Sequence, residues 1–327
     1  MRSILAFAPA VVSLLVTSVA AAQDPVPPPQ PTPDTASSSS EARPKDVEPK
    51  APTAVSPWQL RGLSTGTSLR LDSTVAPYTS ATTNLGYVET VSLFSASVQV
   101  AKEFAIQSKI GVVHSDPDST GTAAASGITN ATVGGFYGTR LGSFFRFGAG
   151  AAVGLPIGQG SGNNPDPAVA SAMKAAALAR SGFDNTMFSV NEVGFPFGAD
   201  LAYVRGRLTA QIEMNVIPSV RVQGELKSPD AQKVNSTAGI FLGYFLVANR
   251  LSVGAELRNQ LYLSDPVAVQ KDSTQRDSLS AAGGLRAYFP ITANVMIKPG
   301  FSYGRGVYGA IADAHYQMVA FDLPVTF

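Results

Sequence analysis

The chain has 327 residues, 14% of them charged, and a formal net charge of +1. A typical soluble domain carries about 25% charged residues, and a nucleic-acid-binding domain needs a strongly basic face, so the composition indicates no nucleic-acid partner. The chain has no cysteine, which excludes disulfides, thiolate metal sites and a cysteine nucleophile. It also excludes lipid attachment to a cysteine at a mature N-terminus.

The first 22 residues have the three parts of a secretory signal peptide. Arg2 supplies the positive charge, residues 4–16 form an apolar stretch, and Ala20 to Ala22 make a small-residue cleavage site. We expect residues 1–22 to be removed. A retained anchor helix is the alternative, but its apolar length is borderline for a membrane span, which needs about 20 residues.

Residues 23–57 have a different composition from the rest of the chain. Ten of the 23 prolines and the run Ser37 to Ser40 fall here, and none of the 30 glycines does. Proline removes backbone donors, and no apolar pattern exists to bury. We expect 23–57 to be a disordered periplasmic tether, with contact to cell-wall material as the alternative interpretation.

The C-terminus alternates between apolar and other residues, which indicates a β-strand with one lipid-facing side. The apolar positions are Val319, Phe321, Leu323, Val325 and Phe327. This ending resembles the last strand of bacterial outer-membrane β-barrels, which finishes in an aromatic residue preceded by apolar residues at alternate positions. The resemblance is to the class and not to one family. It implies that these five residues are the signal read by the barrel assembly machinery.

The same alternation recurs from Trp58 onward, so we expect residues 58–327 to form an all-β, antiparallel, up-and-down transmembrane barrel of about twelve strands. Very short connections are expected at 102–103, 141–142, 205–206, 249–250 and 290–293. Longer ones are expected near 73–84, 116–126, 157–190, 223–233, 265–277 and 306–313. An even number of strands places the tether and the C-terminus on one, periplasmic, side.

Charged residues at mid-strand positions distinguish this barrel from a soluble β-sandwich, the alternative architecture. A sandwich buries its apolar face, whereas here the inner face carries charges, glycines and hydroxyls, and the apolar face contacts lipid. Opposite charges beside a low-dielectric wall should pair across the lumen. The residues expected to line the lumen are Arg70, Lys109, Arg146, Asp200, Glu213, Glu256, Arg258, Arg286, Lys298 and Asp322.

One long loop, 157–190, carries a helix signature. Asp166 and Pro167 are a good N-cap and first helical residue, residues 168–180 are rich in alanine, and Ser181-Gly182 ends the run. Few charges follow Asp166, so the helix should pack against something, either capping the outer mouth or folding inward as a constriction.

Three features fit the barrel less well. Pro196 and Pro299 lie within expected strands and should mark bulges. The stretch 241–247 is apolar on both faces apart from Gly243. The expected first strand, around 63–71, alternates weakly.

Catalysis and metal binding have little support. His114 is followed directly by Ser115, and neighbours on a strand point to opposite faces, so the His-x-Ser arrangement of outer-membrane lipid hydrolases is absent. The acidic turn at 116–121 lacks the later carboxylate of a calcium loop. We expect no catalytic residue, no metal and no cofactor.

Three functions remain. The first is a narrow porin-like channel for small solutes, partly occluded by lumen charge pairs and by the 157–190 loop. The second is a non-conducting structural or surface-interaction barrel. The third, a lipase-like barrel enzyme, is disfavoured by the missing nucleophile and base. Neutralising Glu213 and Glu256 should loosen the lumen network and increase an anion preference.

Overall fold

The computed structural model describes residues 53–80, 84–118, 124–160, 165–224, 226 and 230–327. The expected signal peptide and most of the expected tether lie outside the described residues. The chain divides into two units, and every described residue belongs to the second, Ala51–Phe327.

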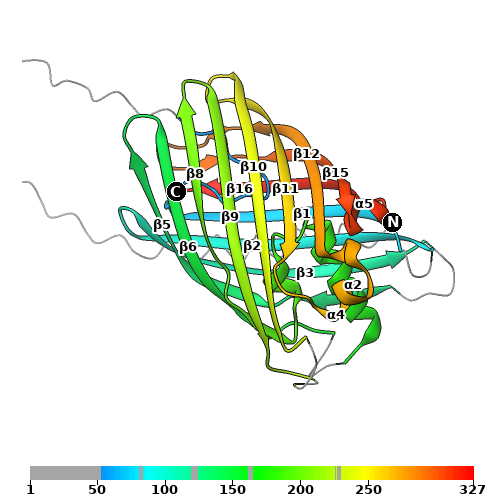
Figure 1. The fold of residues 1–327 in the computed structure, drawn as a ribbon. Helices are drawn as coiled ribbons and strands as arrows, with labels where there is room; N and C mark the ends of the chain where they lie inside the picture. The colour runs from blue at the N-terminus through cyan, green and yellow to red at the C-terminus, as the bar shows by residue number, and fades with distance from the viewer. Residues whose placement is uncertain (1–52, 81–83, 119–123, 161–164, 225, 227–229) are drawn as a thin grey trace, which may run out of the picture. The chain divides into compact units, whose positions relative to one another are not determined.

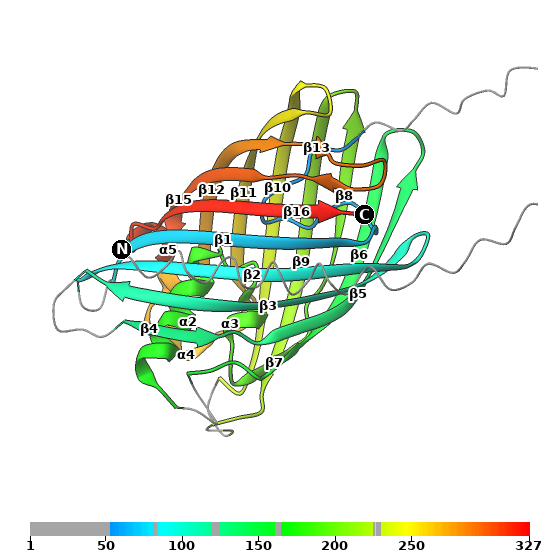
Figure 2. The same cartoon turned by 180° about the vertical axis from the view of Figure 1, so that it is seen from behind.

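Twelve antiparallel strands form the wall of a closed barrel (Figures 1 and 2). The first strand pairs with both the second and the last, so the sheet has no free edge. In order around the barrel the wall strands are β1 (Ser68–Thr79), β2 (Gly86–Ala101), β3 (Phe104–Pro117), β5 (Ala131–Leu141), β6 (Phe145–Leu155), β8 (Phe197–Arg205), β9 (Leu208–Arg221), β10 (Gln232–Val247), β11 (Leu251–Tyr262), β12 (Asp277–Ala287), β15 (Gly300–Gly309) and β16 (Gln317–Thr326).

Shorter strands and helices lie between the wall strands in the sequence. The additional strands are β4 (Ala125–Ile128), β7 (Glu192–Gly194), β13 (Phe289–Pro290) and β14 (Met296–Ile297). The helices are α2 (Pro167–Ala179), α3 (Asn185–Phe188), α4 (Val267–Lys271), α5 (Ala310–Asp313) and the 3-10 turn η2 (Ser273–Arg276). In the described part of the chain, no helix is long and apolar enough to cross a membrane.

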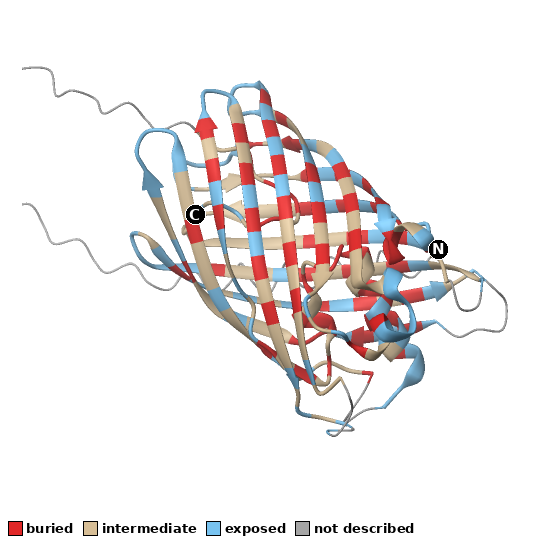
Figure 3. Ribbon diagram, in the orientation of Figure 1, coloured by how far each residue is buried: buried red, intermediate tan, exposed pale blue. Residues whose placement is uncertain are grey.

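Along most of the wall strands, more buried inward residues alternate with more exposed outward residues, which appear as bands in Figure 3. The outward row is apolar, with exposed residues such as Ile212, Met214 and Ile240. The residues of the C-terminal strand pattern also lie on this face, where Phe321 and Phe327 are exposed. An apolar exterior around a polar interior is the arrangement of a membrane barrel.

Short turns and long loops lie at opposite ends of the barrel, as the sequence predicts. The turn end carries the tight connections at 102–103, 142–144, 206–207 and 248–250, together with the small β13–β14 hairpin. The loop end carries the others, of which 156–196 is the longest. Chain termini of the barrel share the turn end, because Phe327 N donates to Thr67 O.

Several local expectations are confirmed. Helix α2 begins where predicted, with the Asp166 carboxylate accepting from the backbone N–H groups of Ala168 and Val169. It ends at a left-handed pair, Ser181 at φ 54° and Gly182 at φ 74°. The expectation of bulges at the two prolines is wrong: Pro196 interrupts the strand between β7 and β8 and Pro299 precedes β15, and the pairing register is the same on both sides of each.

The first strand differs from its expected position. We expected it around 63–71, followed by a loop near 73–84, but β1 runs from Ser68 to Thr79. The weak alternation of residues 63–67 has a physical reason, since these residues precede the wall and have no lipid-facing side.

Candidate functional site in the barrel interior

The ten charged residues expected in the lumen face the barrel interior. Nine lie on inward positions of wall strands, and Lys298 lies just before β15 beside an interior cavity. Six are buried, namely Asp200, Glu213, Glu256, Arg258, Arg286 and Asp322. The other four, Arg70, Lys109, Arg146 and Lys298, are half-buried.

Opposite charges pair along the wall and not across the lumen, which differs from the expectation. Asp322 forms ion pairs with Arg286 at 2.8 Å and with Arg70 at 3.1 Å. Arg258 forms an ion pair with Glu256 at 2.8 Å. Arg286 reaches Asp322 over Gly300 of the intervening strand, where an added Cβ would lie 2.3 Å from the Asp322 carboxylate. Pairing across the lumen is prevented because two chain segments occupy its centre.

The first of these segments is residues 53–66, which we call the N-terminal insertion. It lies inside the barrel, hydrogen-bonded to inward-facing side chains of β9, β11 and β12. Residues 53–57, expected to belong to the disordered tether, are therefore part of the barrel interior, and Val55 is 2% exposed. The expected boundary at 57/58 lies too far along the chain.

Wall carboxylates accept the backbone N–H groups of the insertion. Glu256 accepts from Trp58 N at 2.5 Å, and Glu213 accepts from Arg61 N at 2.5 Å. A segment without regular secondary structure needs such partners, because an unpaired buried N–H group is costly. The buried acids thus serve as acceptors for an irregular backbone as well as partners for arginines.

Wall donors bind the carbonyl oxygens of the same segment. Arg286 donates to Ser56 O at 3.2 Å and to Pro57 O at 3.0 Å. Arg70 donates to Trp58 O, and Gln211 donates to the carbonyl of Arg61 at 2.9 Å. The wall therefore binds both N–H and C=O groups of the insertion's backbone.

An apolar cluster fixes the insertion against one half of the barrel. Val55, Trp58 and Leu60, each at most 3% exposed, pack with Phe241, Phe245 and Tyr288. Trp58 meets Phe241 edge-on, with ring centroids 6.0 Å apart. This contact accounts for the stretch of β10 that is apolar on both faces, since its inner face packs against the insertion and its outer face belongs to the apolar exterior of the barrel.

The second segment is the long loop 156–196, which folds inward. Arg180, at the C-cap of α2, is 2% exposed and pairs with Asp72 of β1 at 2.9 Å and with Asp184 at 3.1 Å. Lys109 of β3 pairs with Asp184 at 2.6 Å. Burial alone would raise the pKa of Asp184, but Lys109 and Arg180 hold it well below its usual value. Two ion pairs thus connect the loop to the inner wall.

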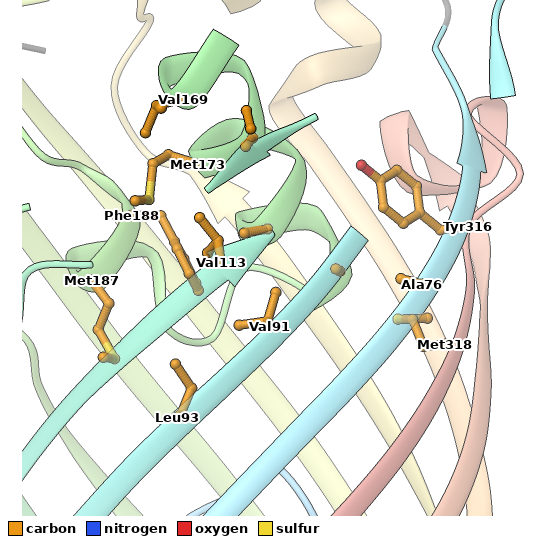
Figure 4. Packing of buried hydrophobic residues seen from close by; sticks show 14 of the residues in the cluster. Ala76, Val91, Leu93, Val113, Val169, Met173, Met187, Phe188, Tyr316 and Met318 are labelled. Carbon is orange, nitrogen blue, oxygen red and sulfur yellow. The ribbon is translucent and has the colours of Figure 1, made fainter. Parts of the chain in front are cut away.

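Apolar packing continues this attachment toward the loop end. Met173 of α2 and Met187 and Phe188 of α3 lie against Val91, Leu93 and Val113 of the wall, with Tyr316 and Met318 on the far side of the same cluster (Figure 4). Ser181 also donates toward Met318 and pairs with Ser280 at 2.7 Å. The described part of the loop therefore packs against the inner side of the wall.

Asp72 and Arg70, two residues apart on β1, connect the two inserted segments. Asp72 binds Arg180 of the loop, and Arg70 binds both Asp72 at 3.1 Å and the carbonyl of Trp58 in the N-terminal insertion. The sequence did not indicate the roles of Arg61, Asp72, Arg180 or Asp184. The role of Asp72 could have been found from the sequence, because Asp72 lies two residues after Arg70 and therefore faces the same side of the strand.

A cavity of about 330 Å³ remains between the inserted segments and the β1–β6 side of the wall. Arg61 of the N-terminal insertion, over the ring of Phe136 at 5.3 Å, forms part of its lining. Arg180, Asp184 and Met187 of the loop form another part. The cavity thus lies between the two insertions and has both charged and apolar walls.

The histidine arrangement offers no catalytic dyad with Ser115. Ser115 is buried, whereas His114 lies half-exposed on the outward face and its Nδ1 is 2.7 Å from Ser126 Oγ of β4. Among the described residues, no acid is hydrogen-bonded to His114, and no group of three histidine or acidic side chains could hold a metal ion.

Comparison with solved structures finds the same fold in an outer-membrane channel, and weaker likeness to other barrels. An outer membrane channel from Pseudomonas putida F1 aligns with a TM-score of 0.55 at 13% identity, covering 84% of this chain and all of that one. The NanC porin aligns at 0.44 with 9% identity, covering 79% of this chain and 98% of that one. The transport unit of the autotransporter AIDA-I from Escherichia coli aligns at 0.42 with 10% identity, covering 81% and 90%.

No protein-family model matches the sequence, and no curated protein matches it. The structural likeness is therefore one of fold, with sequence identity too low to carry substrates or residues across. Together with the closed twelve-strand wall, the apolar exterior and the alternation of short turns and long loops, it identifies the fold as that of a bacterial outer-membrane β-barrel.

Proposed function

We propose that this protein is a narrow outer-membrane channel for small solutes that is held closed by its own chain. The observation that carries the proposal is the pair of segments inside the lumen, each attached to the wall by a limited set of contacts. A twelve-strand barrel lies between the eight strands that enclose only side chains and the sixteen or more that leave an aqueous pore. What fills its lumen therefore decides whether it conducts.

Single-channel recording of the refolded mature chain tests the proposal. We expect small or no conductance from the full chain and a clear increase after deletion of residues 53–62. Replacing residues 166–190 by a short Gly/Ser linker should also increase it, and the double variant should conduct most. Heat-modified mobility in gels serves as the control that each variant has formed a barrel.

A non-conducting structural barrel is the second candidate, favoured by how completely the interior is filled. It predicts that both single variants and the double variant stay closed. A large conductance of the full chain, unchanged by either alteration, would contradict the proposed occlusion and indicate a simple porin.

We further propose that a cleaved signal directs the chain to the outer membrane, with the turn end and both termini periplasmic. The apolar exterior and the outward Phe321 and Phe327 support this. Lipid is then the partner of the outer face, and the assembly machinery is the partner of the last strand. Contact with cell-wall material, proposed from the composition of 23–57, can concern only the residues before 53, because 53–57 lie inside the barrel.

Deleting Phe327 is expected to impair assembly, because it removes the terminal aromatic residue of the proposed recognition pattern. Envelope fractionation should then show less barrel in the outer membrane and more degraded or aggregated protein in the periplasm. Equal recovery of truncated and complete chains in a soluble periplasmic fraction would show that the chain is not a membrane barrel.

A further inference from the structure

The cavity between the two insertions has more hydrogen-bond donors to spare than acceptors. We propose that it binds a small organic carboxylate, and that this is the class of solute that the proposed channel transports. The inference rests on the proposed channel function for its biological meaning, but binding itself can be measured in the closed barrel.

Strand register gives the cavity a wall rich in donors. Ser95 of β2 lies opposite Arg70 of β1 on one side and opposite Lys109 of β3 on the other, and Ser97 lies in the same way between Ser68 and Gln107. All six line the cavity, and so does Thr132, opposite Lys109 on β5. This face therefore presents hydroxyl, amide and cationic groups with no carboxylate among them.

The three carboxylates that line the cavity already have cations or N–H donors. Asp184 binds Lys109 and Arg180, at 2.6 and 3.1 Å. Asp72 binds Arg180 and Arg70. Glu213 accepts from the backbone of Arg61 and from Asn215. Few acceptor positions are left for a cationic solute.

Several donors, in contrast, remain unused. Among the described residues no carboxylate lies within ion-pair distance of Lys298, a half-buried cation whose pKa is lowered by its burial and by Arg286. The hydroxyl of Ser97, which is 8% exposed, and the Nε of Arg70 are buried without a hydrogen-bond partner. Buried polar groups in this state require a water or a ligand.

These groups fit a carboxylate better than a simple sugar or a cation. A carboxylate accepts charge-assisted hydrogen bonds from several donors at once. The unused acceptors at the cavity, Gln59 Oε1 and Thr186 Oγ1, can receive a hydroxyl group of the same solute. A volume of about 330 Å³ is at the small end of ligand pockets, so the solute should be small.

Calorimetric titration of the refolded full-length mature chain in detergent, with sodium lactate, sodium acetate and glycerol as probes, tests the inference. We expect lactate and acetate to bind with a dissociation constant on the order of 1 mM, weak enough for release into the periplasm, and glycerol to bind at least about tenfold more weakly. Lys298→Met should weaken lactate binding by about tenfold or more, because it removes the unpaired cation.

Two further variants keep the test decisive. Lys174→Met removes the same charge from the exposed side of α2, outside the cavity, and should leave binding unchanged. Ser97→Ala removes one neutral donor and should weaken lactate binding by a few fold. Lactate binding equal to that of glycerol, or unaffected by both Lys298→Met and Ser97→Ala, would overturn the proposal. Binding in a barrel that never conducts would support it and contradict the channel function instead.

Discussion

Replacing Arg180 by glutamine is expected to release the inward-folded loop from the barrel wall. Arg180 is 2% exposed and neutralises two buried acids, Asp72 and Asp184. Removing one partner from a buried ion pair usually costs about 3–5 kcal/mol, because the remaining charge stays buried. Each acid keeps a second cation, Arg70 or Lys109, so we expect the lower end, about 3 kcal/mol.

The measurement is the rate of trypsin cleavage after Lys174, which lies on α2 in the same loop. If cleavage requires the loop to open, about 3 kcal/mol corresponds to roughly a hundredfold faster cut. Conductance should rise in parallel, since the loop lines the cavity.

A matched control is Arg276→Gln at the loop end. Arg276 pairs with Asp265, but the two side chains are 42% and 63% exposed, and exposed pairs contribute only about 0–1 kcal/mol. Cleavage after Lys174 should therefore be unchanged in this variant. Identical cleavage rates in the Arg180 and Arg276 variants would show that the loop is held by its apolar packing alone.

Periodicity was enough to predict the wall of this protein. Alternation of apolar and polar residues predicted an antiparallel barrel of about twelve strands and which residues of each strand face outward, because the inside and the outside of a barrel impose the same period of two on every strand. The loop helix was also predictable, since Asp166, Pro167 and Gly182 act through contacts within a few residues.

The lumen contents were not predictable in the same way. Residues 53–66 form irregular backbone, so they show no periodicity, and their partners are distant in sequence. The contact of Arg61 with Glu213, for example, spans 152 positions. The stretch 241–247, apolar on both faces, fitted the barrel pattern poorly, and the structure explains it, because the inner side of this stretch packs against Trp58, the single tryptophan. Only the folded barrel brings the two together.

Neutralising Glu213 and Glu256 together is expected to open the channel and not only to change its ion preference, because of where the two carboxylates lie. Both carboxylates hold backbone N–H groups of the N-terminal insertion at 2.5 Å. Hydrogen bonds to a charged group contribute about 1.5–3 kcal/mol each. Glu256→Gln also leaves Arg258, 2% exposed, without its ion pair. The double variant Glu213→Gln, Glu256→Gln should therefore release the insertion.

Conductance and selectivity separate release of the insertion from simple loss of charge. We expect the double variant to approach the conductance of the barrel lacking residues 53–62 and to favour anions more strongly. Glu192→Gln is the control for contact with the insertion, because Glu192 is a buried inner-face acid at the end of the loop 156–196, paired with Lys233 at 2.5 Å, and has no hydrogen bond or ion pair to the described residues of the insertion. It removes the same kind of charge and leaves the insertion attached, so it should change selectivity slightly and raise conductance much less than the double variant. If Glu192→Gln opened the barrel as much as the double variant, general electrostatics would control occlusion, and the carboxylate contacts to Trp58 and Arg61 would not.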